Sequence, residues 1–275
     1  MDVTQAILFA VLQGVTELFP VSSLGHAVVV PHLLGWNVDQ ESPAFLPFLV
    51  MLHVGTALAL LVYFWRDWWL LVQSIVRWPG GLAEAESRRL LLMLVLGTLP
   101  AGVLGLVLER RLAALFGAWQ VAAVFLIVNG GVLFLGELLR RGRRDQTLTT
   151  LRPWQALAIG ASQALALIPG LSRSGCSMVG GLLVGLSHQS AARFSFLLAT
   201  PIILAAAVLE LPKLAAPELR PELLPAVLAG LVAGVAAYLS TTFLMRYFKQ
   251  QEVNALVPFG IYCILLGAAT LVFGG

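Results

Sequence analysis

Two short polar clusters carry the residues of this 275-residue chain that could do chemistry. The first cluster holds Gln13 and Glu17, which share one face of a helix, followed by Ser22, Ser23 and His26. A carboxylate can bind a divalent cation or act as a base, and an imidazole can act as acid, base, nucleophile or hydrogen-bonding clamp. The serine hydroxyls could bind phosphate, attack it, or only cap the next helix. The cluster therefore predicts metal-assisted or acid–base chemistry on a phosphate.

The second cluster predicts a cradle for an anion. Ser172, Arg173, Ser174 and Gly175 follow Pro169-Gly170 and are expected to open a helix. Backbone N–H groups at a helix N-terminus bind anions, and a guanidinium offers planar, paired hydrogen bonds that suit phosphate. Alternatively, Arg173 could form an ion pair with Glu17 whose only purpose is to hold the two clusters together.

The composition places both clusters in a membrane protein. Apolar residues make up 59% of the chain and charged residues 11%, whereas soluble domains carry about 25% charged residues. Polar groups at membrane depth are costly and usually line a site or a pathway. The net charge of +3 predicts no nucleic-acid partner, and Cys176 and Cys263 resemble neither a disulfide framework nor a zinc site. We expect one integral membrane domain over residues 1–275.

The elements that position the clusters are expected to be helices of two kinds. Six stretches have the roughly 20 apolar residues of a spanning helix: about 44–65, 90–108, 119–139, 194–211, 223–243 and 253–273. Regions 5–35 and 155–187 are also apolar, but Pro, Ser and Gly break each one near its middle. Each half is about 20 Å of helix, too short to cross a bilayer. The sequence therefore predicts an all-α polytopic membrane protein with two re-entrant helix–loop–helix hairpins.

Basic residues predict how the chain is oriented. With these assignments twelve arginines and lysines fall on one face and four on the other, which marks the first face as cytoplasmic. The twelve are Arg66, Arg77, Arg88, Arg89, Arg140, Arg141, Arg143, Arg144, Arg152, Arg193, Arg246 and Lys249. Both termini are then expected outside, on the face opposite the cytoplasm.

The same assignment of spans and hairpins also predicts an internal repeat. At an offset of 150 the two hairpins share eight identities, against about two or three expected by chance. They are Gln5/Gln155, Ala6/Ala156, Gln13/Gln163, Ser22/Ser172, Gly25/Gly175, Val29/Val179, Leu33/Leu183 and Gly35/Gly185. Because the first hairpin enters from outside and the second from the cytoplasm, we predict an inverted-topology repeat with halves 1–139 and 140–275 and a site near the midplane.

At these residues the chain resembles the undecaprenyl-diphosphate phosphatases of the bacitracin-resistance type. The family pattern has Glu or Gln, three residues and Glu, then Pro-Val-Ser-Ser-x-Gly-His, here Gln13, Glu17 and Pro20 to His26. Its second pattern, Pro-Gly-x-Ser-Arg-Ser-Gly, corresponds to Pro169 to Gly175, and its Phe-Ser-Phe-Leu-Leu-Ala segment to Phe194 to Ala199. The resemblance covers essentially the whole chain.

The resemblance implies an enzyme that removes the terminal phosphate of undecaprenyl diphosphate with a divalent cation, Mg²⁺ or Ca²⁺. This recycles the lipid carrier for peptidoglycan synthesis and confers bacitracin resistance, with a site open to the periplasm. Carried over by position, Glu17 is the essential carboxylate and metal ligand, Ser23 and His26 are nucleophile or base candidates, and Arg173 is the phosphate clamp. The implied substrate-binding residues are Gln13, Ser22, Ser172, Ser174, Gly175 and Ser177.

Several points stay open at this stage. Gln13 stands where many members have Glu, and a neutral amide cannot accept a proton as a base. His53, near the start of an expected span, could reach the site or be a satisfied core histidine. The runner-up function is a flippase that returns the lipid carrier to the cytoplasmic leaflet. Ser-x-Gly-His is superficially similar to the soluble-acid-phosphatase-like membrane superfamily, but no His follows Arg173 at the spacing that its triad needs. A homodimer is possible.

Overall fold

The computed structural model describes residues 3–36, 42, 44–77, 81–113, 118–140, 146–251 and 253–274, which are almost entirely helical. In these ranges five helices are long and apolar enough to cross a membrane. They are α3 (Phe45–Tyr63), α5 (Leu82–Ala113), α6 (Trp119–Leu138), α9 (His188–Glu210) and α10 (Arg220–Gln250). The sixth expected span corresponds to α11 (Val257–Phe273), which is apolar but has only 17 residues. The prediction of an all-helical membrane protein is thus confirmed, while the count of six spans stays a prediction.

The two regions expected as hairpins are each a pair of short helices. Residues 5–35 contain α1 (Val3–Thr16) and α2 (Ser23–Leu33). Residues 155–187 contain α7 (Pro153–Ala164), the 3₁₀ turn η2 (Leu165–Leu167) and α8 (Arg173–Leu183). Each helix has between 11 and 14 residues. At 1.5 Å per residue, roughly 16–21 Å, none can cross a bilayer alone.

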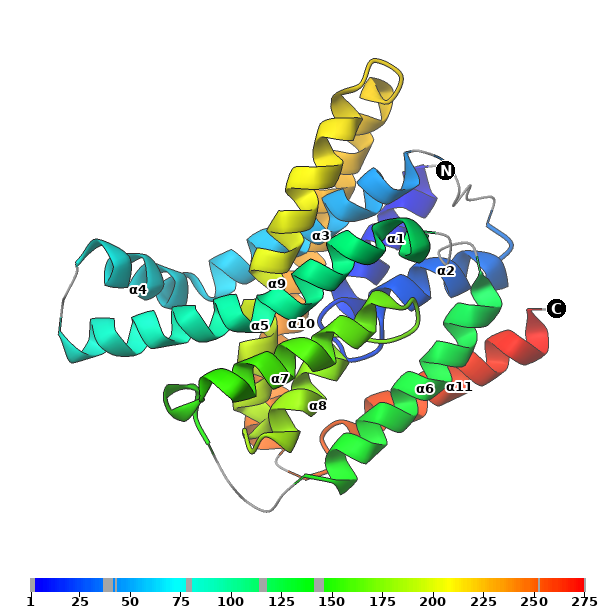
Figure 1. The fold of residues 1–275 in the computed structure, drawn as a ribbon. Coiled ribbons are helices and arrows are strands. Elements are labelled where there is room, and N and C mark those ends of the chain that lie inside the picture. Colours follow the sequence, from blue (N-terminus) through cyan, green and yellow to red (C-terminus); the bar gives the residue numbers. More distant parts are fainter. Residues whose placement is uncertain are drawn as a thin grey trace.

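The long helices surround these short pairs. Figure 1 shows α1 and α2 in blue beside α7 and α8 in green, with α9 and α10 as a steep antiparallel pair and α6 alongside α11. The two short pairs have corresponding neighbours, since α1 packs on α10 and α7 packs on α5. The long helices that follow the two pairs, α3 and α9, pack on each other. This packing agrees with an internal repeat.

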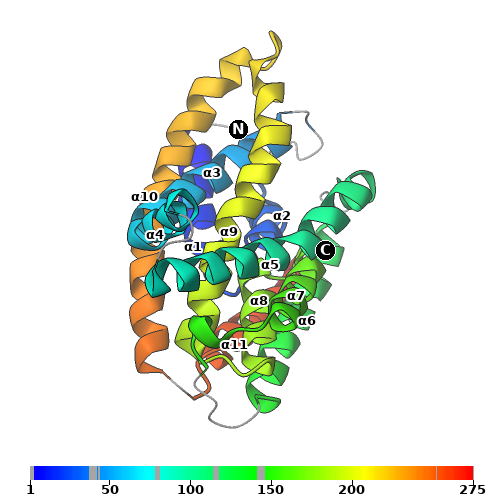
Figure 2. The same cartoon turned by 60° about the vertical axis from the view of Figure 1, so that its left-hand side comes forward.

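The connection between α3 and α5 contains a helix that the sequence analysis did not predict. A further helix, α4 (Trp65–Val76), follows α3 directly, and α5 begins at Leu82, before the expected start near residue 90. Figure 1 shows α4 and the first turns of α5, which pack together, as an arm at one edge of the molecule, and this arm comes forward in Figure 2. The α4 helix is amphipathic and rich in tryptophan, so its residues were not apolar enough to be expected as a span.

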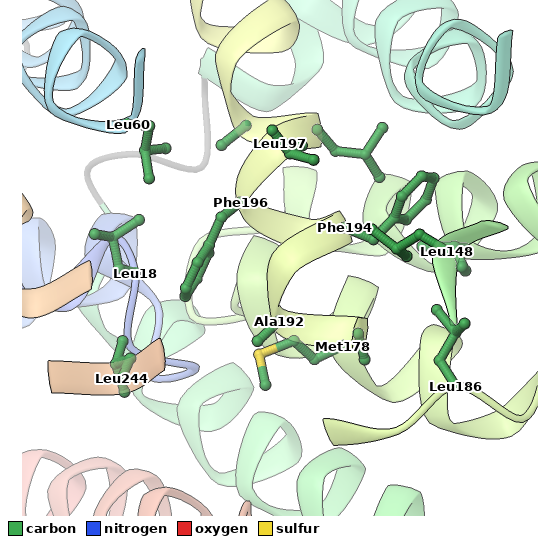
Figure 3. Close-up of a cluster of buried hydrophobic side chains, with 14 of the residues drawn as sticks. Leu18, Leu60, Leu148, Met178, Leu186, Ala192, Phe194, Phe196, Leu197 and Leu244 are labelled. Atoms are coloured by element: carbon green, nitrogen blue, oxygen red, sulfur yellow. The ribbon is translucent and has the colours of Figure 1, made fainter. Parts of the chain in front are cut away.

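The main core lies next to the first polar cluster. Leu18, which follows Glu17 directly, is fully buried against side chains of α3, α9 and α10. Figure 3 shows Leu18 facing Phe196 of α9, with Leu60 and Leu244 on either side. Burying a side chain of this size is worth about 1.5–3 kcal/mol. The core therefore fixes the backbone next to Glu17, the carboxylate of the first cluster.

Candidate active site

The tips of the two hairpins begin with the same local structure. The Ser22 hydroxyl accepts a hydrogen bond from the Gly25 N–H at 3.1 Å and caps α2. The Ser172 hydroxyl accepts from the Gly175 N–H at 3.0 Å and caps α8 in the same way. Each cap satisfies one of the free N–H groups of a helix N-terminus. Two helix N-termini, each favourable for an anion, are thereby placed at the tips.

The tips pack against each other through equivalent positions. A Cβ on Gly25 would lie 3.0 Å from Gly170 Cα, and a Cβ on Gly175 would lie 3.3 Å from Pro20 Cβ. These contacts are related by the offset of 150, since residues 25 and 20 correspond to 175 and 170. The Ser174 hydroxyl also donates across the contact to the Phe19 carbonyl at 3.0 Å. The two clusters, far apart in sequence, therefore meet.

Asn129 of α6 joins the two tips from one side. Its Nδ2 donates to the Pro20 carbonyl at 3.0 Å, and its Oδ1 accepts from the Ser172 N–H at 2.9 Å. Asn129 is completely buried. Because both partners are backbone groups of opposite tips, this one amide fixes their spacing. Sequence reasoning placed Asn129 inside a span and gave it no role.

Glu17 is the centre of the contacts between the clusters. Its Oε1 accepts from Arg173 Nη2 at 2.6 Å and from Arg173 Nε at 3.2 Å. Its Oε2 accepts a short hydrogen bond from the Ser23 hydroxyl and another from Gln13 Nε2 at 3.0 Å. The His53 Nε2 atom lies 3.1 Å from the same oxygen. The structure thus brings together Gln13, Glu17, Ser23 and Arg173, as the sequence predicted.

His53 belongs to this cluster, although the sequence gave it no more weight than a core histidine. Its Nδ1 lies 2.8 Å from the Leu49 carbonyl while its Nε2 faces Glu17. Both ring nitrogens face acceptors, which suits the doubly protonated, cationic ring. One carboxylate then faces the two cations Arg173 and His53, and the excess positive charge favours an anionic ligand. The only signal in the sequence was an imidazole within an otherwise apolar span.

The remaining serines lie around the cluster without touching Glu17. Ser172 and Ser174 share a hydrogen bond of 3.0 Å at the start of α8. The Ser177 hydroxyl donates to the Arg173 carbonyl at 2.8 Å and lies 2.6 Å from the Ser195 hydroxyl of α9. In this arrangement Ser177 helps to hold the first turn of α8, from which Arg173 extends.

His26 faces away from Glu17. Its Nδ1 lies 2.7 Å from the Ser22 carbonyl, and its Nε2 lies 2.8 Å from the hydroxyl of Tyr262 on α11. Its ring is fully buried and stacks on the Tyr262 ring. Of the three roles open in the sequence, this geometry favours the hydrogen-bonding clamp, because neither ring nitrogen is free to reach a phosphate.

The side chains around Glu17 can be compared with the ligands that the expected divalent cation requires. In the described ranges no three His, Cys, Asp or Glu side chains gather as a metal cage. Mg²⁺ is often held by one or two carboxylates together with the phosphates of the substrate, and it does not need an all-protein cage. One carboxylate beside a cradle for an anion fits that mode, so Glu17 is the residue that would hold such a cation.

Fold and site together define an α-helical membrane protein with a buried, positively charged site at the tips of two short helix pairs. Residues 6–269 match the family model described as bacitracin resistance protein BacA, and the chain belongs to this family. It is 55% identical over 274 residues to the undecaprenyl-diphosphatase of Acidiphilium cryptum, covering 97% of this chain and 96% of the relative. It is 52% identical over 274 residues to undecaprenyl-diphosphatase 2 of Chromobacterium violaceum, covering 99% of each. The undecaprenyl-diphosphatase of Granulibacter bethesdensis is 51% identical over 98% of this chain and 96% of its own length.

Proposed function

We propose that this protein hydrolyses undecaprenyl diphosphate to undecaprenyl phosphate and inorganic phosphate. The observation that carries the proposal is the cluster of Glu17, Ser23 and Arg173, which is built from both hairpin tips and is nearly closed to solvent. The family and the names of the relatives agree with it. The product is the lipid carrier for peptidoglycan, so its recycling accounts for resistance to bacitracin.

Arg173 is the group that would receive the terminal phosphate. Its Nη1 is buried and has no hydrogen-bond partner among the described residues. A buried, unpaired guanidinium N–H costs free energy until an anion binds it. Phosphate offers matching oxygens, and the N-termini of α2 and α8 add further donors. Ser172, Ser174 and Gly175 lie at the start of α8 and would contact the same phosphate, with Ser22 and Ser177 supporting the two tips.

Ser23 is the proposed nucleophile. Its hydroxyl already donates to Glu17, so Glu17 can take the proton as Ser23 Oγ bonds to the terminal phosphorus. The bond from phosphorus to the bridging oxygen breaks, and undecaprenyl phosphate leaves. Water then attacks the phosphorus of the phosphoserine, and the bond from phosphorus to Ser23 Oγ breaks. Glu17 returns its proton to Ser23 Oγ, and the inorganic phosphate leaves with both hydrogens of the water. Arg173 stabilises the charge that develops on the phosphoryl oxygens in both steps.

A divalent cation, Mg²⁺ or Ca²⁺, is part of the proposal. Glu17 would hold it together with oxygens of the diphosphate, with the Gln13 amide beside it. When bound, the cation neutralises part of the charge on the diphosphate. The amide of Gln13 fits an orienting role, because it donates to Glu17 and cannot act as a second base.

We further propose that the two short helix pairs are re-entrant and inverted with respect to each other in the plasma membrane. Six spans would then leave both termini and the opening of the site on the periplasmic side. Support comes from the short helices and from the matching contacts of α1 with α10 and α7 with α5. The end of α2 also lies beside the C-terminus and the start of α6, since His32 contacts the Gly274 carbonyl at 2.6 Å and stacks on Trp119.

The test is phosphate release from undecaprenyl diphosphate by purified protein in detergent, with and without Mg²⁺ or Ca²⁺. We expect cation-dependent release that Glu17→Ala lowers by about a thousandfold, because the substitution removes the proton acceptor of Ser23 and the partner of Arg173. Glu210→Ala is the matched control, since Glu210 is another buried carboxylate, paired with Lys213 at 2.7 Å. Absence of release by folded wild-type protein, or equal activity of both variants, would contradict the proposal.

A flippase remains the second candidate, because repeated halves with broken helices suit alternating access. The same protein can be placed in vesicles with a labelled polyprenyl phosphate. Movement of the lipid between leaflets that survives Glu17→Ala would support transport, and movement at the rate of protein-free vesicles would exclude it.

A further inference from the structure

Ser22 has a backbone conformation that a residue with a Cβ seldom adopts. Its φ is 70° and its ψ is 94°, and Asn254 is the only other described non-glycine residue with positive φ. Ser172, the equivalent residue of the other tip, caps α8 in the same way with φ −89° and ψ 122°. Capping therefore does not require the unusual conformation. Strain of this kind persists only where the surrounding structure enforces it.

The backbone conformation of Ser22 affects the placement of Ser23, the next residue. The side chain of Ser23 points to Glu17 of its own tip and donates a short hydrogen bond to it. In the other tip the corresponding residue is Arg173, which extends across to Glu17 from an unstrained turn. The unusual turn at Ser22 is thus associated with the placement of the proposed nucleophile.

His26 holds this turn through the Ser22 carbonyl. That carbonyl accepts from the His26 backbone N–H at 3.1 Å and lies 2.7 Å from His26 Nδ1. Since a carbonyl can only accept, Nδ1 must carry the ring proton, and in the neutral ring Nε2 is an acceptor. The hydroxyl of Tyr262 lies 2.8 Å from Nε2 and can donate to it. The second tip has Cys176 at the position of His26 and therefore lacks this clamp.

Tyr262 fixes the orientation of the His26 ring. The two rings are nearly parallel, with centroids 5.6 Å apart and an interplanar angle of 4°, which is the range of favourable offset stacking. Tyr262 lies on α11, which is not part of either hairpin. A residue outside both tips therefore reaches the turn that carries Ser23.

We propose that Tyr262 is a positioning residue for the phosphatase reaction. Its hydroxyl donates to His26 Nε2 and its ring stacks on the imidazole, which fixes the ring so that Nδ1–H holds the Ser22 carbonyl. The turn at Ser22 then keeps Ser23 on Glu17. His26 is then a second positioning residue that does not touch the substrate. This inference rests on the proposed function, because it assumes that Ser23 and Glu17 act on the diphosphate.

The first experiment compares Tyr262→Phe with Tyr247→Phe. Each change removes one hydroxyl, and the Tyr247 hydroxyl donates to the carbonyl of Ala255, a residue outside both hairpins, at 3.0 Å. We expect Tyr262→Phe to lower kcat about tenfold or more with KM within about twofold, since misplaced reacting groups slow turnover without weakening ground-state binding. Tyr247→Phe should keep the wild-type kcat. Similar kinetics for the two variants would overturn the proposal, as would a raised KM with unchanged kcat.

The second experiment measures the state of the His26 ring nitrogens directly and does not depend on turnover. The chain has four histidines, so ¹⁵N-histidine labelling with a His26→Gln variant identifies the His26 signals. We expect the Nδ1–H tautomer with a hydrogen-bonded Nε2 in wild type and in Tyr247→Phe. In Tyr262→Phe the Nε2 resonance should shift to that of an imidazole nitrogen that accepts no hydrogen bond. An unchanged His26 spectrum in Tyr262→Phe would overturn the proposal. Failure of the wild-type enzyme to release phosphate would instead contradict the proposed function, and the two failures are therefore distinguishable.

Discussion

The two hairpin tips share the same helix cap but carry different chemistry. Ser22 and Ser172 cap their helices alike, and Gly25 and Gly175 pack on equivalent positions of the opposite tip. The side chains that face the site differ. Glu17 corresponds to Leu167, and Ser23 corresponds to Arg173. The comparison teaches that two tips with the same helix cap supply different groups, the carboxylate and hydroxyl from the first and the cation from the second.

The glutamines show the same divergence in a single residue type. Gln13 donates to Glu17 at 3.0 Å. Gln163, its equivalent, is as deeply buried, yet neither of its amide atoms has a hydrogen-bond partner among the described residues. The difference follows from the residue one turn later, which is Glu17 in the first tip and Leu167 in the second. Among the described residues, the side-chain amide of Gln13 has a polar partner and that of Gln163 has none.

The largest expected effect comes from removing the cation that the second tip supplies. Arg173→Ala should lower kcat/KM by about a thousandfold, because it removes transition-state stabilisation and leaves Glu17 buried without its strongest partner. Arg173→Lys keeps the charge but loses the paired geometry, so we expect a loss of about tenfold to a hundredfold. Phosphate release measures both. Equal losses for Ala and Lys would show that geometry, not charge, explains the whole role of Arg173.

Removing the hydroxyl that the first tip supplies should lower activity nearly as much. Ser23→Ala should lower kcat by about a hundredfold to a thousandfold, since a proposed nucleophile is lost while the cradle remains. Ser174→Ala is the matched control from the second tip, and we expect a loss below about tenfold because other donors hold the phosphate. Rapid-quench detection of a phosphoserine in wild type checks the assignment. A Ser23→Ala enzyme as active as Ser174→Ala would contradict it.

The contact between the second tip and α6 predicts a stability effect. Gly170 has φ +101°, and a Cβ there would lie 2.5 Å from the Ala122 carbonyl oxygen. Gly170→Ala should therefore destabilise the protein by about 3 kcal/mol or more, from backbone strain and overpacking together. Gly35→Ala separates the two causes, because Gly35 has φ +62° with open space around its Cα. We expect a loss of only about 1 kcal/mol there. Thermal unfolding in detergent would contradict this account if both variants shifted equally.

The smallest expected effect concerns the unpartnered amide. Gln163→Met should raise the free energy of unfolding by about 1 kcal/mol, because a buried amide without partners is replaced by an apolar chain of similar size. Gln13→Met should instead lower activity, since it removes a donor to Glu17. Thermal unfolding and phosphate release are measured on both. A loss of activity in Gln163→Met without a gain in stability would show that the second amide contacts the substrate.

The sequence predicted much of the fold because its signals were local. Broken apolar runs identified the short helix pairs, and the offset of 150 paired Gln13 with Gln163 before any contact was known. The contact of Arg173 with Glu17 was foreseen only as the alternative to an anion cradle, since an arginine at membrane depth needs a counter-charge. The α4 helix was not expected, since its amphipathic pattern of 12 residues is not that of a span.

The rest of the site depends on contacts that no local pattern encodes. His53 and Tyr262 reach the tips from α3 and α11, and their roles follow from the packing of those helices. The φ of 70° at Ser22 could not be foreseen either, because the equivalent Ser172 caps its helix without strain. His26 looked like an acid or base from its neighbours in sequence, and only its partners in space show which groups its ring nitrogens meet.

The central claim is that two unlike tips make one catalytic unit. It is tested most directly by phosphate release from Glu17→Gln, Arg173→Lys and the double variant, measured beside wild type. Residues that act as a unit are not additive in kcat. The account predicts that the double variant is about as slow as the slower single variant, within about threefold. A double variant slowed by the full product of the two single losses would show that the tips act independently, and would contradict the account.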